Sequence, residues 1–175
     1  MRRVLYVLGQ LSDDNIEWMI AHGERRQVTP GTVLIEEGKP TGILLIVLDG
    51  TLGVYVGNKL IATRGSGEIL GEMSFVEDRA ATATIKAEEN TVLYIIPQDR
   101  MAQQLETDRD FAARFYRGVA ISLSYRLRES MEGTGPAQIE SLDDIEDDEL
   151  LDDGVLDNAY LAGMRFERIV QRMMD

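Results

Sequence analysis

The sequence predicts a mainly β fold, a double-stranded β-helix or jelly-roll β-roll, flanked by helices. Residues 25–97 divide into short apolar segments separated by turns rich in Gly, Pro, Asn and Asp. Many short strands with regularly spaced turns are typical of such rolls. Before and after this region, apolar side chains recur at every third or fourth position instead, which indicates helices.

The chain is predicted to begin with two helices. Residues 4–11 carry Val and Leu at helical spacing. Ser12 is then the expected N-cap of a second helix, whose apolar side chains lie between Ile16 and Ile20, because a Ser side chain can accept a hydrogen bond from a free N–H of the first turn.

The β region is predicted from its turns and from the apolar runs between them. Its turn motifs are Thr29-Pro30-Gly31, Glu37-Gly38, Asp49-Gly50, Gly57-Asn58 and Gly65-Ser66-Gly67. Asp49-Gly50 lies between two apolar runs, a pattern that predicts a hairpin. The longest apolar run, residues 43–48, has the length of a buried strand and is far too short to cross a membrane.

Residues 67–84, which we call the cassette segment, carry the pattern most informative about function. Gly71 can adopt a positive φ or bring its backbone close to a ligand. The backbone N–H groups of Glu72, Met73 and Ser74 are then expected to open a short helical turn that attracts a phosphate. The Glu72 carboxylate can accept a hydrogen bond from a sugar hydroxyl, so the segment predicts a site for a sugar phosphate.

Two hydroxyl side chains extend this prediction. Ser74 and Thr82 are candidate hydrogen-bond donors to a phosphate or a purine. Thr82 has a structural alternative, because Thr is favoured in strands whether or not a ligand is present.

With these motifs, residues 5–131 resemble the cyclic nucleotide-binding domain family, which includes the sensor module of the bacterial catabolite activator protein, kinase regulatory subunits and several channels. The upstream motifs also occur in the family's order, namely Pro30-Gly31-Thr32-Val33-Leu34-Ile35, Glu37-Gly38, the run 43–48, Asp49-Gly50 and Thr51-Leu52-Gly53-Val54-Tyr55-Val56. The resemblance implies a β-roll that binds cyclic AMP or cyclic GMP and needs no other cofactor.

One position departs from the family pattern. The Arg that neutralises the cyclic phosphate in the family falls on Ala81 when the predicted strand from Thr84 to Ala87 is aligned without a gap. The nearest guanidinium, Arg79, lies two residues earlier, a displacement of roughly 6 to 7 Å along an extended chain. Arg79 is therefore either a substitute phosphate ligand or a solvent-exposed partner of the neighbouring acids.

Helices are predicted again after the roll, a short one over residues 98–107 and a long one over about 108–130. Apolar side chains from Phe111 to Leu127 recur at threes and fours along the long helix. In the family this helix is both the dimer seam and the lid over the nucleotide. The extent of its apolar surface favours a homodimer, and packing on the chain's own roll is the alternative.

The segment after residue 131 is predicted to be an acidic linker over residues 132–154. Residues 132–138 have a linker composition, and residues 140–153 contain nine acids and no base. Leucines are interleaved with these acids, as in segments that order on binding a protein partner, although a solvated tether is the alternative. Fewer than forty residues follow 138, too few for the DNA-binding domain of the family's transcription factors.

An amphipathic C-terminal helix is predicted over residues 155–175. Phe166 and Ile169 lie on its apolar face and Arg165 and Arg168 on another. The helix has three possible docking sites, the chain's own roll, a second subunit or a protein partner, and the sequence alone favours none of them.

Composition excludes several other classes. The net charge of -13 opposes binding to nucleic acid. No signal peptide or membrane span is indicated, and the absence of Cys favours the reducing cytoplasm. The only His, His22, has no accompanying nucleophile motif, and neither a catalytic acid/base pair nor a metal site is expected.

Two functional hypotheses follow. In the first, a non-catalytic sensor binds cyclic AMP or cyclic GMP through Gly71, Glu72, Met73, Ser74, Arg79 and Thr82, and signals through the long helix and the tail to a protein partner. In the second, a degenerate roll has lost its nucleotide at Ala81 and acts as a dimerisation or protein-interaction module.

Overall fold

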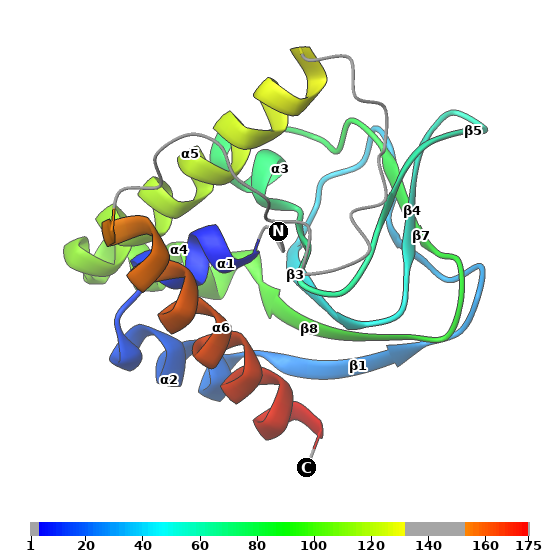
Figure 1. The fold of residues 1–175 in the computed structure, drawn as a ribbon. Coiled ribbons are helices and arrows are strands. Elements are labelled where there is room, and N and C mark those ends of the chain that lie inside the picture. The colour runs from blue at the N-terminus through cyan, green and yellow to red at the C-terminus, as the bar shows by residue number, and fades with distance from the viewer. Residues whose placement is uncertain (1–3, 132–152, 175) are drawn as a thin grey trace.

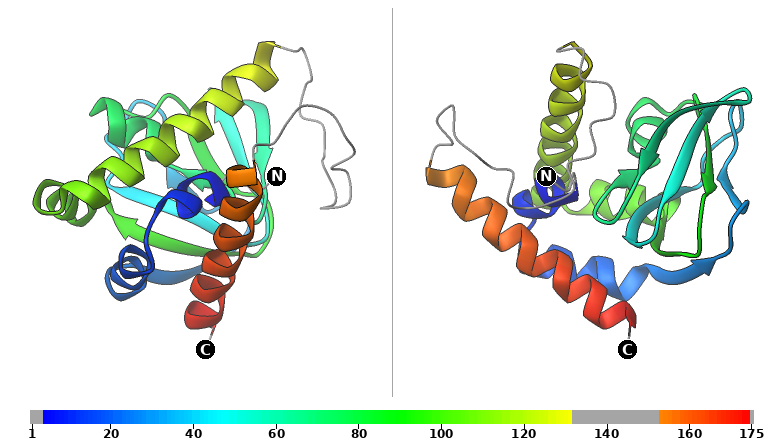
Figure 2. Two further views of the ribbon diagram at one scale, coloured as in Figure 1. Left: turned by 60° about the vertical axis from the view of Figure 1, so that its left-hand side comes forward. Right: turned by 45° about the vertical axis from the view of Figure 1, so that its right-hand side comes forward.

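The computed structural model describes residues 4–131 and 153–174, so the acidic linker predicted over 132–154 lies almost wholly outside the described residues. Two antiparallel sheets face each other, and α5, α1 and α6 gather on one side of them (Figures 1 and 2). The predicted β-roll with flanking helices is therefore confirmed.

The strands form two sheets of four. Their bounds are β1 Glu24–Val28, β2 Val33–Ile35, β3 Ile43–Asp49, β4 Leu52–Val56, β5 Lys59–Arg64, β6 Ile69–Leu70, β7 Thr84–Ala87 and β8 Thr91–Pro97. One sheet has the order β1-β8-β3-β6 and the other β2-β7-β4-β5. We call them the helix-side sheet and the outer sheet.

The helices occupy the positions that the periodicity and capping signals indicate. Their bounds are α1 Val4–Gln10, α2 Asp13–His22, α3 Glu72–Glu77, α4 Gln98–Thr107, α5 Arg109–Met131 and α6 Asp153–Met174. Ser12 is the N-cap of α2, since its hydroxyl accepts a hydrogen bond from the Asn15 N–H at 3.2 Å and the Asn15 side chain accepts one from the Ser12 N–H at 3.0 Å. Such reciprocal bonds satisfy two otherwise free donors.

The hairpin predicted at Asp49-Gly50 is wrong. The strands on either side of it, β3 and β4, belong to different sheets, so this turn carries the chain from the helix-side sheet to the outer sheet. Gly50 has a φ of +90°, and a Cβ there would lie 2.8 Å from the Asn90 carbonyl oxygen. Gly50 is thus required because the backbone passes close to that of Asn90. The chain does form a hairpin at Gly57-Asn58, between β4 and β5.

The helix-side sheet is buried on both faces, which explains the uninterrupted apolar run in β3. Leu44 and Ile46 belong to the core under the helices, whereas Leu45 and Val47 belong to the core between the sheets. Alternate residues of a strand point to opposite faces, so a strand covered on both sides is apolar throughout.

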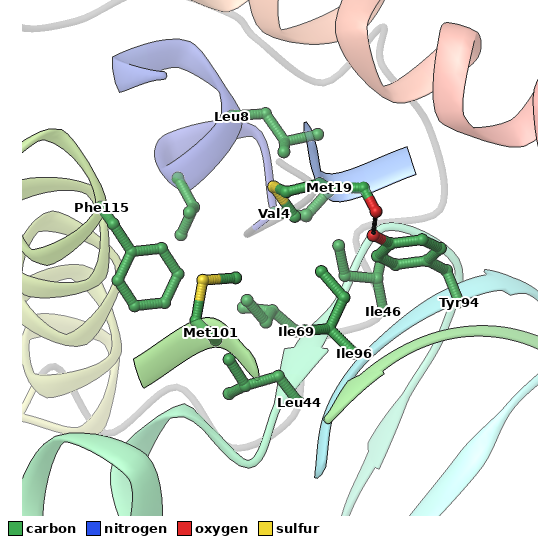
Figure 3. Close-up of a pocket in the computed structure, with 11 residues that line it drawn as sticks. Val4, Leu8, Met19, Leu44, Ile46, Ile69, Tyr94, Ile96, Met101 and Phe115 are labelled. Carbon is green, nitrogen blue, oxygen red and sulfur yellow. Dashed lines mark hydrogen bonds between the residues drawn. The ribbon is translucent and has the colours of Figure 1, made fainter. Parts of the chain in front are cut away.

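The core under the helices contains a small void, drawn in Figure 3. Val4, Met101 and Phe115 line it, and its volume of about 10 Å³ leaves no room for a ligand. Tyr94 places its hydroxyl at the edge of this core and donates a hydrogen bond to the Met19 carbonyl. Burial raises the pKa of the Tyr94 hydroxyl, so the phenol stays protonated and remains a donor.

Helix α1 lies between α5 and α6 (Figures 1 and 2). At its crossing with α5, Gly118 approaches so closely that a Cβ on it would lie 2.6 Å from the Val7 Cα. Phe111, Phe115 and Val119 of α5 are buried in the core of this chain. The apolar stripe of α5 is therefore covered largely within the chain.

The C-terminal helix, α6, docks on the chain's own N-terminal helices. It packs against α1 and α2 and touches β1, and it buries Ala162, Phe166 and Ile169. Arg165 donates hydrogen bonds to the carbonyls of Leu8 at 3.0 Å and Gly9 at 3.3 Å. These carbonyls belong to the last turn of α1, where helix carbonyls lack partners within the helix, so the guanidinium caps α1.

Of the helices in the described ranges, none is both long enough and apolar enough to cross a lipid bilayer.

Candidate functional site

A pocket of about 110 Å³ lies between the cassette segment, the inner face of the outer sheet and α5. Its wall includes the apolar side chains of Ile35, Val54, Leu70 and Ile85. Its charged and hydroxyl-bearing side chains are Arg64, Glu72, Ser74, Thr82 and Arg126. The pocket thus combines an apolar cavity with a few polar groups, as small-molecule sites usually do.

Gly71 immediately precedes α3 and has a backbone conformation that is unfavourable for a residue with a side chain. Its φ is +87°, and a Cβ at this position would lie 2.4 Å from the Ile43 carbonyl oxygen. Both the left-handed backbone and the close approach require Gly. The fold therefore specifies Gly71 with or without a ligand.

The residue that holds this turn lies outside the cassette segment. The Gln98 side-chain amide donates hydrogen bonds to the carbonyls of Ile43 and Gly71, each at 3.1 Å. Gln98 opens α4, and its amide thereby fastens the cassette segment to β3. A Gln at a helix start has no distinctive sequence signal for such a role.

Glu72, the expected sugar ligand, is buried, with 2% of its surface exposed. Its Oε1 accepts a hydrogen bond from Nη1 of Arg126 at 2.5 Å. Arg126 also donates from Nη2 to the Ile69 carbonyl at 3.2 Å. A buried carboxylate needs such a partner, because an unpaired charge is costly to remove from water.

Arg126 joins α5 to the cassette segment across the pocket. Its Nε is buried and has no hydrogen-bond partner among the described residues. No sequence motif points to this residue, since 54 positions separate it from Glu72. The resemblance implied only that the long helix covers the ligand.

The other expected ligands have different outcomes. Met73, Ser74 and Thr82 line the pocket together with Gly71 and Glu72. Arg79 is not among the lining residues; its side chain is 76% exposed and lies 3.8 Å from the Glu77 carboxylate. The structure therefore brings five of the six expected residues together and leaves Arg79 at the surface.

Ala81, at the position of the family Arg, is buried and forms part of the pocket wall. Arg64 of β5 lines the same pocket, with 21% of its side chain exposed. Arg64 has no sequence signal for this position, because it lies outside the cassette segment at the end of a strand with no motif.

Comparison with known proteins agrees with the fold. Residues 25–108 match the model of the cyclic nucleotide-binding domain. The chain is 29% identical to the Pycsar effector protein XpPycTIR of Xanthomonas perforans over 114 residues, which are 65% of this chain and 36% of that protein. The chain thus spans about a third of this relative's length.

Solved structures show the same architecture. A cyclic nucleotide-binding domain from Methylobacillus flagellatus has a TM-score of 0.67 and 22% identity, covering 80% of this chain and 85% of that one. The catabolite activator protein of Thermus thermophilus has a TM-score of 0.60 and 21% identity, with coverages of 73% and 60%. Residues 25–108 thus match the model of the cyclic nucleotide-binding domain, and the chain shares the fold of solved structures of such proteins.

Proposed function

We propose that this chain is a non-catalytic regulatory sensor that binds cyclic AMP or cyclic GMP in the pocket beside α5. The observation that carries the proposal is the Glu72–Arg126 ion pair, which joins the cassette segment to the long helix across the pocket. A ligand that engages Glu72 must act on the contact that holds α5.

In this proposal the cassette segment binds the sugar and the phosphate. Glu72 accepts a hydrogen bond from the ribose hydroxyl, and Ser74 and Thr82 donate to the phosphate or base, since all three line the pocket. The apolar wall formed by Val54 and Ile85 suits the face of a nucleobase.

The size of the pocket supports a change of shape on binding. At about 110 Å³ it is smaller than the roughly 300 Å³ at which pockets for drug-sized ligands begin. We expect entry of a nucleotide to displace α5 and Arg126 outward. A ligand that binds the shifted state more tightly moves the population of α5 toward it.

The signal has a physical route to the C-terminal helix. α1 contacts both α5 and α6, and Arg165 of α6 binds the end of α1. A displacement of α5 at the Gly118 crossing therefore acts on α1 and on the docking surface of α6. Release of α6 would present the tail to a protein partner.

A homodimer through α5 remains part of the proposal. Most of the apolar stripe of α5 is covered by the chain itself, but Tyr116 and Leu127 are 45% and 62% exposed. These two residues lie three helical turns apart on one face. Sedimentation of the native chain and of Leu127→Glu tests the seam, because a charge on that face should shift a dimer toward monomer.

The site is tested by titrating a fluorescent cyclic AMP analogue into Glu72→Ala and Glu77→Ala. Glu72 lines the pocket, whereas Glu77 is exposed and outside it. We expect Glu72→Ala to weaken binding at least tenfold and Glu77→Ala to leave it unchanged. Equal affinity of a folded Glu72→Ala variant and the native chain would remove Glu72 from the site.

A second function, a ligand-free interaction module, is favoured by one observation. Ala81 occupies the position of the family Arg. Arg126 already neutralises the Glu72 carboxylate within the chain, so this charge is compensated without a nucleotide. In that case neither cyclic nucleotide would bind, and the exposed faces of the roll and the tail would be the working surfaces.

A further inference from the structure

The charged side chains of the pocket are already paired within the chain. Glu72 is 2% exposed, and its carboxylate is held by Arg126. Arg64 lies 3.7 Å from the carboxylate of Glu68, whose side chain is 15% exposed, and each of these two residues takes part in a further interaction. Two guanidinium groups are thus matched by two carboxylates, and the charges of the four groups sum to zero.

A cyclic phosphate therefore meets no uncompensated cation among the described residues that line the pocket. Ala81 forms the wall at the position of the family Arg, and Arg79 lies outside the pocket. Arg126 has an Nε–H without a hydrogen-bond partner in the described part of the chain, but Glu72 compensates the charge of its guanidinium. An anion that enters such a pocket loses hydration without gaining an opposite charge, which is unfavourable.

The other polar side chains of the pocket lining are the hydroxyl groups of Ser74 and Thr82. A hydrogen bond from a neutral donor is roughly half as strong as one from a charged donor. These hydroxyls therefore compensate little of the cost of burying a phosphate, and they bind an oxygen or nitrogen of an uncharged ligand equally well.

The sugar, in contrast, has a charged partner. The Glu72 carboxylate has roughly four acceptor sites, and Nη1 of Arg126 occupies one of them. Glu72 can therefore accept hydrogen bonds from ribose hydroxyl groups while it stays paired with Arg126. A nucleoside offers two adjacent hydroxyl groups, on C2′ and C3′, whereas a 3′,5′-cyclic nucleotide offers only the one on C2′ because its phosphate occupies the other oxygen.

We infer that the pocket recognises the uncharged ribonucleoside part of its ligand and holds the phosphate through neutral donors alone. Glu72 binds the ribose, and the apolar wall that includes Val54 and Ile85 contacts the base. Purine nucleosides are then ligands of the same site, and the cyclic phosphate adds less than about tenfold to the affinity. The inference rests on the proposed function, whose pocket and sugar contact it uses, and it specifies which part of the nucleotide carries the binding.

The native chain itself provides the first test, by isothermal titration with cyclic AMP, adenosine, cyclic GMP and guanosine. A charge-assisted hydrogen bond to the phosphate would be worth about tenfold to a hundredfold in Kd. We expect the cyclic nucleotide that binds to do so less than about tenfold more tightly than its nucleoside. A larger preference for the cyclic nucleotide would overturn the inference and leave the proposed function intact.

A variant supplies the missing cation. Ala81→Arg places a guanidinium at the family position, and Ala80→Arg is the matched control because Ala80 is exposed and does not line the pocket. We expect Ala81→Arg to bind the cyclic nucleotide about tenfold to a hundredfold more tightly than the native chain does. Nucleoside affinity should stay the same, and Ala80→Arg should bind every probe as the native chain does.

Thermal unfolding confirms that each variant is folded. Should Ala81→Arg unfold, Glu68→Gln replaces it, because it removes the counter-charge of Arg64 and keeps the shape of the side chain. Its gain should again be confined to the phosphate-bearing probes. A folded variant without this gain, or with an equal gain for nucleosides, would overturn the inference.

Two further outcomes separate the inference from the proposed function. Binding of a nucleoside by a native chain that binds neither cyclic nucleotide would overturn the proposed function and support the inference. If the native chain binds none of the four probes, both are overturned.

Discussion

At the residue scale, the backbone at Gly71 fixes the shape of the site. Its positive φ and its contact with the Ile43 carbonyl leave no space for a Cβ. Gln98 then bonds both carbonyls of this contact. The pocket therefore borders a turn whose backbone is fixed by its contact with Ile43 and by the Gln98 side chain.

Gly71→Ala should therefore lower the free energy of unfolding by more than the cost of placing Ala in a left-handed backbone conformation. Gly31 is a matched control, since its φ is +85° and a Cβ there would meet nothing within 4 Å. We expect Gly31→Ala to lower the free energy of unfolding by about 1 kcal/mol and Gly71→Ala by more than about 2 kcal/mol. Urea denaturation measures both, and equal losses would contradict the close approach.

Sequence reasoning found the residues whose roles are local. Gly71, Glu72 and Ser74 follow one another in a recognisable turn and line the pocket. Arg64 and Arg126 were missed because the sheet register and the helix packing bring them to the pocket from distant positions. For Arg79 the structure agrees with the second alternative that the sequence left open, since its side chain is exposed beside Glu77.

At the element scale, the contact between α1 and α5 determines where the long helix lies. Gly118 permits the two helix backbones to approach at Val7. Ile69 and Glu72 hold the other part of α5 through Arg126. Of these two contacts, only the one at Arg126 borders the pocket.

Gly118→Ala should disturb this crossing. A Cβ would lie 2.6 Å from the Val7 Cα, so the helices must separate. Gly163 of α6 is the control, because a Cβ there meets nothing within 4 Å. We expect Gly163→Ala to stabilise the protein by about 0.5–1 kcal/mol and Gly118→Ala to destabilise it by about 1–3 kcal/mol. Thermal unfolding measures both; stabilisation by Gly118→Ala would contradict the close crossing.

The sequence predicted elements better than connections. Ser12 and the spacing of apolar residues located α2 and α5, because capping and periodicity are local properties. The Asp49-Gly50 hairpin failed, since turn chemistry specifies a reversal of the chain and not the sheet that the next strand joins. Here β3 pairs with β6 and β8 instead of with β4.

At the scale of the whole molecule, α6 completes the helical layer over α1 and α2. The sequence showed that α6 is amphipathic but left its docking site open, because an apolar face fits any apolar groove. Arg165 makes the contact specific through its bonds to the Leu8 and Gly9 carbonyls and its 3.1 Å pair with Asp13.

Arg165→Ala should loosen α6 from the rest of the molecule. The Arg165 side chain is 13% exposed, whereas that of Arg168 is 42% exposed and makes a 3.4 Å pair with Glu17. We expect Arg165→Ala to reduce the local stability of α6 by about 2 kcal/mol and Arg168→Ala by less than about 0.5 kcal/mol. Amide hydrogen exchange in α6 measures the difference, and equal exchange in the two variants would argue against the cap.

The central claim is that the pocket beside α5 binds a cyclic nucleotide. Isothermal titration of the unmodified chain with cyclic AMP and then cyclic GMP tests it most directly. We predict one site of micromolar or tighter affinity for at least one of them, on the order of -8 kcal/mol. The absence of binding by either nucleotide at millimolar concentration would contradict the account and identify the chain as a ligand-free interaction module.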